Sequence, residues 1–62
     1  MKRTELEKKL KKLGWRLVRN GSKHDIWGNG EESEAVPRHN EINDYLAKKI
    51  IATAEASLKK ED

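Results

Sequence analysis

The 62-residue sequence contains no cysteine and no long apolar run, and both absences restrict its class. Without cysteine it has no disulfide framework and none of the common thiolate zinc sites, which fits a protein of the reducing cytosol. No stretch approaches the roughly 18 apolar residues of a membrane span, and the basic N-terminus leads into a charged segment, unlike a signal peptide. We therefore expect a cytoplasmic protein without a membrane segment.

Several motifs for ligand binding and catalysis are also missing. No glycine-rich loop leads into a helix to cradle nucleotide phosphates. The serines lack the context of a nucleophile elbow, and His24 and His39 lack neighbouring ligands at zinc-site spacing. We expect neither a metal nor a cofactor. The chain is short enough to make one domain, residues 1–62, whose core contributes roughly 3 to 5 kcal/mol, so a partner or oligomer would add stability.

Positive charge is concentrated at one end of the chain. Residues 1–23 contain nine Lys or Arg and two acids, a formal charge of +7, whereas residues 24–62 contain five and nine, a charge of −4. A basic patch attracts phosphate backbones through counterion release, and such asymmetry points to nucleic acid. The alternative is a lysine-rich helix face that only keeps the protein in solution.

A first helix is predicted near the N-terminus. Thr4 and Glu7 fit a capping box, and leucines recur at helical spacing until Gly14, which suits the end of a helix. The helix is expected over about residues 5–13, with its lysines facing solvent or a polyanion.

A second helix is predicted after Pro37. Its N-cap is either Asn40 or Asn43, and residues 59–62 are expected to be a frayed tail. The apolar i, i+4 row that defines the helix consists of Ile42, Leu46, Ile50, Ala54 and Leu58.

Three strands are predicted between the helices. Alternating aromatic and β-branched residues mark Trp15–Arg19, and Asn20-Gly21 follows as a hairpin turn in which Gly21 supplies a positive φ. The next strands cover His24–Trp27 and Ser33–Val36. The expected fold class is α+β: a two-layer α-β-β-β-α domain whose three-stranded antiparallel sheet carries two helices on one face. This order resembles the double-stranded-RNA-binding fold.

A lone histidine on a basic surface suits RNA cleavage, which needs no metal. RNA carries its own nucleophile, the 2′-hydroxyl, so the protein must move protons near neutral pH and stabilise the charge of the phosphorane. His24 fits the first role, and Arg16, Arg19 or Arg38 fit the second through forked contacts with phosphate oxygens. The alternative is a surface histidine that merely begins a strand.

Two segments resemble the HicA family of toxins. They are residues 13–27, LGWRLVRNGSKHDIW, and residues 35–39, AVPRH. In that family a helix-ending Gly-Trp leads to a strand, a Gly-Ser-x-His motif, a Val-Pro-x-His stretch and a closing helix. The resemblance implies a double-stranded-RNA-binding-like fold and ribosome-independent cleavage of messenger RNA, with His24 as general acid or base. It also implies neutralisation by a HicB-type antitoxin.

Residues around the motif histidine and on the first helix are candidates for RNA contact. Lys23 would point away from that histidine in a regular strand. Because Glu31, Glu32 and Glu34 make the later turn acidic, RNA is expected on the other side of the sheet. Trp27 either stacks on a base or packs at the sheet edge. The predicted RNA-binding residues are Lys8, Lys12, Arg16, Arg19, Lys23 and Arg38.

Two other classes of function stay open. In a double-stranded-RNA-binding module without cleavage, the basic first helix would hold the RNA and His24 would have no role. In a protein-interaction subunit, RNA affinity would be weak and would depend little on salt. His39 belongs to the Val-Pro-x-His stretch and serves either to order the start of the second helix or in catalysis.

Overall fold

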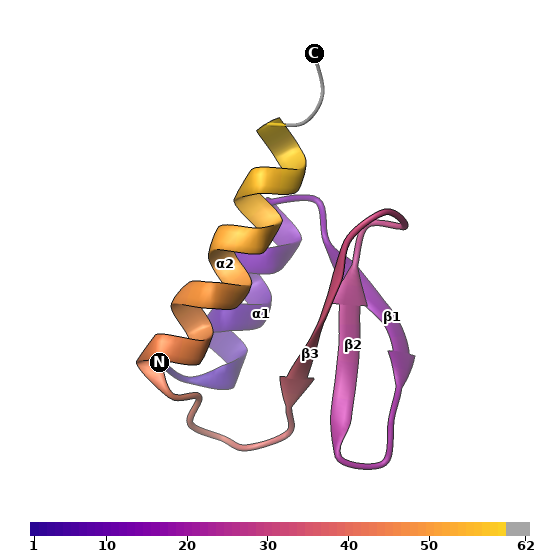
Figure 1. The fold of residues 1–62 in the computed structure, drawn as a ribbon. Coiled ribbons are helices and arrows are strands. Elements are labelled where there is room, and N and C mark those ends of the chain that lie inside the picture. The colour runs from indigo at the N-terminus through magenta and orange to yellow at the C-terminus, as the bar shows by residue number, and fades with distance from the viewer. Residues whose placement is uncertain (60–62) are drawn as a thin grey trace.

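The computed structural model describes residues 1–59, which form two helices and three strands. The elements are α1 (Arg3–Lys12), β1 (Arg16–Asn20), β2 (His24–Gly28), β3 (Ser33–Pro37) and α2 (Asp44–Lys59). The antiparallel sheet has the order β1-β2-β3, and both helices lie on one face of it (Figure 1). The predicted fold class and element order are therefore confirmed, and the topology is consistent with a double-stranded-RNA-binding fold.

Helix α1 does not begin with the predicted capping box of Thr4 and Glu7. It begins at Arg3, and within the described chain its N-cap side chain makes no cap hydrogen bond. The backbone N–H of Arg3 instead donates to the carbonyl of Asn40 at 3.0 Å, and Glu7 Oε2 lies 3.6 Å from Arg3 Nε. The segment before α2 thus supplies the partner for the first turn. Gly14 follows the helix with a φ of 89°, as the sequence predicts.

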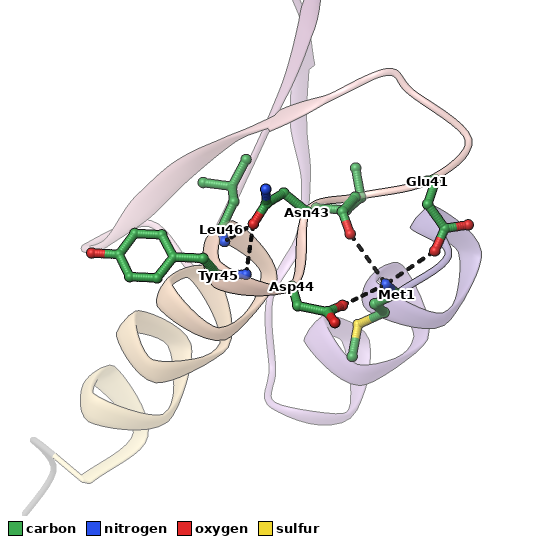
Figure 2. Close-up of polar contacts among 7 residues, drawn as sticks. Met1, Glu41, Asn43, Asp44, Tyr45 and Leu46 are labelled. Carbon is green, nitrogen blue, oxygen red and sulfur yellow. Dashed lines mark hydrogen bonds and ion pairs between the residues drawn. The ribbon is translucent and has the colours of Figure 1, made fainter.

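The structure decides between the two candidate N-caps of α2. The side-chain oxygen of Asn43 accepts hydrogen bonds from the backbone N–H groups of Tyr45 at 2.7 Å and Leu46 at 3.4 Å (Figure 2). The N-cap is therefore Asn43. At the other end, α2 includes Lys59, and the rest of the predicted frayed tail, residues 60–62, lies outside the described residues.

The buried stripe of α2 departs from the predicted i, i+4 row as the helix proceeds. Each step of four residues turns about 40° past a full helical turn, so a long i, i+4 row drifts around the helix. Leu46 is half-buried and Leu58 is 50% exposed, whereas Ala47 and Ser57 are buried. The core consists of Leu6, Leu10, Trp15, Trp27, Val36, Ile42, Ala47, Ile50 and Ala54.

Ser57 joins three parts of the chain at the end of α2. Its Oγ accepts hydrogen bonds from Trp15 Nε1 at 3.3 Å and from Asn29 Nδ2 at 3.0 Å, and donates to the carbonyl of Ala54 at 3.1 Å. Asn29 Oδ1 in turn accepts from the backbone N–H groups of residues 31 and 32, both at 2.9 Å. The turn between β2 and β3 is therefore ordered by its own asparagine and attached to α2.

The amino group of Met1 connects the start of α1 to the start of α2. It donates to Asp44 Oδ1 at 2.8 Å, to the carbonyl of Ile42 at 3.1 Å and to Glu41 Oε2 at 3.2 Å (Figure 2). The hydrogen bond to Asp44, with that to Glu41, raises the pKa of the amino group above its usual 8.0. The same hydrogen bond lowers the pKa of the Asp44 carboxyl below its usual 3.8.

These two pKa shifts predict how the contact depends on pH. Because the pKa of Asp44 is lower in the folded protein, its contribution to stability is present above the usual value and is lost as pH falls through the lowered pKa. Because the pKa of the Met1 amino group is raised, its contribution is lost as pH rises through that raised value. The stability advantage of wild type over Asp44→Asn should therefore shrink at both ends of the pH range, as measured by urea unfolding.

Glu55→Gln is the matched control, since it removes a carboxylate three turns further along α2. When both proteins also carry Glu55→Gln, the difference caused by Asp44→Asn should shrink in the same way. A constant difference between wild type and Asp44→Asn from about pH 3 to about pH 7 would contradict the assignment.

Candidate active site

Strand β2 presents alternate side chains to the two faces of the sheet. Trp27 is buried on the helix side with 4% of its surface exposed, so it belongs to the core and is not available to stack on a base. Asp25 lies on the same side, because side chains two apart in a strand point the same way. His24 and Ile26 therefore point to the opposite face. Figure 1 shows that the helices leave this face of the sheet open.

The open face collects residues of all three strands around Ile26. Arg19 of β1 and Ala35 of β3 are its cross-strand partners. These side chains and the hairpin tip surround an open hollow of about 560 Å³ beside His24. The lining runs along the chain from Arg19 to His24 and includes Ile26 and Ala35. The hollow is thus basic at its rim, with a small apolar floor.

A β-bulge places a second arginine on this face. Arg16 is paired with Gly28 and Arg19 with Ile26, and these partners share a face because they are two residues apart in β2. Residues three apart in a regular strand point to opposite faces. The register shift around Val18 inserts one extra residue, which turns both arginines to the side of His24.

The hairpin between β1 and β2 differs from the prediction at Asn20-Gly21. Gly21 pairs with His24, since its backbone N–H donates to the His24 carbonyl at 2.7 Å, and Ser22 and Lys23 form the tip. Among the described residues only Gly14 and Gly30 have positive φ, so the positive φ expected at Gly21 is wrong. Glycine is required there for another reason. A Cβ on Gly21 would lie 2.5 Å from the His24 carbonyl oxygen.

Gly21→Ala should therefore displace the backbone of His24. We expect a loss of stability of roughly 0.5 to 3 kcal/mol, together with shifted amide and carbonyl resonances at His24. Gly30→Ala is a matched control, because a Cβ there meets nothing within 4 Å and the cost comes from its φ of +99° alone. Both variants should unfold at lower urea concentration, but only Gly21→Ala should move the resonances of His24. Unchanged His24 resonances in Gly21→Ala would rule out this role.

Arg38 contacts the hairpin that carries His24, and it does so from the helix side of the sheet. Its Nε donates to Asp25 Oδ1 at 2.9 Å and its Nη2 donates to the Gly21 carbonyl at 2.7 Å. Asp25 points to the helix side of the sheet, opposite to His24. The contact of Arg38 with Asp25 and Gly21, called here the Arg38 clamp, thus fastens the end of β3 to the hairpin. Sequence reasoning missed the clamp, because it joins residues 13 and 17 positions apart.

The lysines predicted to contact RNA lie on two sides of the molecule. Lys23 lines the hollow beside His24. Lys8 and Lys12 are exposed on α1, whose buried residues Leu6 and Leu10 face the core. Since α1 covers the helix side of the sheet, its outer lysines lie on the opposite side of the molecule from the open face (Figure 1).

The acidic residues lie away from the hairpin tip. The turn between β2 and β3, which contains Glu31 and Glu32, is at the opposite end of the sheet from the β1-β2 hairpin (Figure 1). Glu34 belongs to the helix side, where its Oε2 accepts a hydrogen bond from Thr53 Oγ1 at 3.1 Å. The open face near the hairpin is therefore basic, and the acidic end of the sheet is separate from it.

His39 is exposed in the segment between β3 and α2 and does not line the hollow. Within residues 1–59, no three His, Cys, Asp or Glu side chains are grouped as a metal ion would require. Over the same residues, no helix has the length and hydropathy to cross a membrane. The chemistry available at the hollow is that of one exposed imidazole with nearby guanidinium and ammonium groups.

A comparison with protein families identifies the chain. The family model described as HicA toxin of bacterial toxin-antitoxin matches residues 3–56, which include α1, the sheet and most of α2. The chain belongs to the HicA toxin family. Searches of curated proteins and of solved structures each found no significant match. As a HicA toxin of a toxin-antitoxin system, the protein has an antitoxin as its implied partner.

Proposed function

We propose that this HicA toxin is a ribosome-independent endoribonuclease that cleaves messenger RNA on the open face, without a metal and with His24 as general acid or base. The position of His24 carries the proposal. It is exposed at the start of β2 and shares its face with Arg16 and Arg19. Because the chain belongs to a toxin family, we expect its target to be a molecule of the cell. Messenger RNA is such a target, and its cleavage would occur in the cytoplasm.

The proposed reaction uses the 2′-hydroxyl of the RNA as nucleophile. Its oxygen forms a bond to the adjacent phosphorus as the proton leaves to a base, and the bond from phosphorus to the 5′-oxygen breaks as that oxygen gains a proton. The products are a 2′,3′-cyclic phosphate and a 5′-hydroxyl. An imidazole can perform either proton transfer near neutral pH, so His24 needs to reach one of the two oxygens.

The arginines stabilise the charge that develops on the phosphorane oxygens. Guanidinium groups donate paired hydrogen bonds to phosphate oxygens, and Arg16 and Arg19 lie on the face where the RNA would pass. Lys23 at the hairpin tip adds a cation to the rim of the hollow. Arg38 and Gly21 act indirectly in this scheme, because they position the backbone of His24.

The proposal extends to neutralisation of the toxin. A HicB-type antitoxin that covers the open face would exclude RNA from His24 without having to unfold the toxin. Binding of the antitoxin and inhibition of cleavage would then be a single event.

His24→Ala should abolish cleavage of a defined messenger RNA while the protein stays folded. The expected loss is at least about 100-fold, the usual contribution of a general acid or base. The assay uses purified protein in excess EDTA, reads out the cyclic phosphate end, and checks folding by circular dichroism.

His39→Ala is the matched control, since it removes the other exposed histidine of the described chain. It should cleave as wild type does. If His24→Ala cleaves normally, or if EDTA stops wild type, the proposed mechanism is wrong, and RNA binding without cleavage by wild type would favour a double-stranded-RNA-binding module.

The salt dependence of RNA binding distinguishes the two basic surfaces. For single-stranded RNA, removing one cation that binds a phosphate should reduce the slope of log K against log salt by about 0.7. We expect that reduction for Arg16→Gln and for Arg19→Gln, measured by fluorescence anisotropy in the His24→Ala background. If Lys8→Gln and Lys12→Gln reduce the slope and the arginine variants do not, RNA binds on α1 and the open face is not the site.

A further inference from the structure

Strand β1 is an exposed edge of the sheet. All five of its residues are exposed, including the apolar Leu17 at 44% and Val18 at 51%. Leu17 pairs with Trp27, so it lies on the helix side of the sheet, yet the helices leave it uncovered. Within residues 1–59, β2 is the one strand that pairs with β1. On either side of the bulge at Val18, the outer edge of β1 therefore combines unpaired backbone groups with apolar side chains, which can pair with another strand.

The opposite edge, β3, carries several features that prevent such pairing. It ends at Pro37, which has no N–H to donate. Glu34 adds a negative charge and accepts a hydrogen bond from Thr53 of α2, and Val36 is buried. A partner strand thus has one favourable edge, that of β1, where the flanking charges are Arg16 and Arg19.

We propose that the outer edge of β1 binds an extended strand of a partner protein that carries acidic side chains at alternate positions. Charge selects this occupant over a second copy of the chain. Two copies paired through β1 would bring Arg16 and Arg19 of each beside those of the other, and like charges across a strand pair are destabilising. Glu or Asp side chains on the partner strand would instead meet both arginines, while its apolar side chains cover Leu17.

Strand addition at β1 would also regulate the hollow. Arg19 belongs both to β1 and to the lining of the hollow beside His24. Carboxylates held by Arg16 and Arg19 would occupy the place of RNA phosphates, so the partner strand and RNA would exclude each other. This consequence rests on the proposed function, whereas the pairing of the strand itself does not.

The test uses a short peptide, acetylated and amidated, in which glutamate and valine alternate. Its binding to isotope-labelled wild-type protein is followed by NMR. We expect chemical-shift changes concentrated in β1 and slower hydrogen exchange of the outward-facing β1 amides. The same peptide with N-methyl groups at alternate positions keeps its charge but cannot pair as a strand, and it should bind about tenfold more weakly, as expected for the loss of one or two net hydrogen bonds.

Two further experiments distinguish strand pairing from simple charge attraction and from an effect on RNA cleavage. A lysine-valine peptide should not bind, and a Leu17→Thr, Val18→Thr protein should bind the glutamate peptide more weakly while cleaving RNA as wild type does. Equal binding of the methylated and unmethylated peptides, shifts centred on β3 or α1, or no shifts at millimolar peptide would each overturn the proposal. Because binding is read without RNA, failure of the cleavage mechanism leaves this result intact, and the reverse also holds.

Discussion

The pleat of β2 is the constraint on which both the core and the candidate site depend. Side chains of a strand alternate between faces, so burial of Trp27 against the helices directs Ile26 and His24 to the open side. A slip of one residue would exchange the two sets, exposing the indole and burying the imidazole. The hydrophobic gain from a buried aromatic side chain, roughly 3 kcal/mol, therefore also determines the direction of His24.

Long-range polar contacts hold the two ends of the sheet around this strand. At one end, the Arg38 clamp ties β3 to the hairpin that carries His24. At the other end, Asn29 orders its own turn and is hydrogen-bonded to Ser57 of α2. An exposed ion pair is worth little by itself, but a charged side chain that also binds a backbone carbonyl restricts where the hairpin can lie. Both ends of a small sheet are thereby fixed without a disulfide.

The charges divide the surface into regions of different character. The open face has Arg16 and Arg19, the outside of α1 has lysines, and the turn between β2 and β3 is acidic. Both arginines belong to the edge strand β1, and Arg19 also lines the hollow. In the two proposals these cations meet phosphate groups in one complex and carboxylates in another, so RNA and a partner strand would compete for them.

The sequence by itself determined the fold class, the order of the elements, the Gly14 helix end and the candidate histidine, because each depends on local periodicity, local conformational preference or a short motif. It left open whether Asn40 or Asn43 caps α2 and which way Trp27 faces. Tertiary structure decided both, together with the uncapped start of α1, the Ser22-Lys23 hairpin tip and the bulge that brings Arg16 and Arg19 to one face. These features depend on strand register and on contacts between residues far apart in the chain, such as Arg3 with Asn40, and such contacts leave no periodic signal in the sequence.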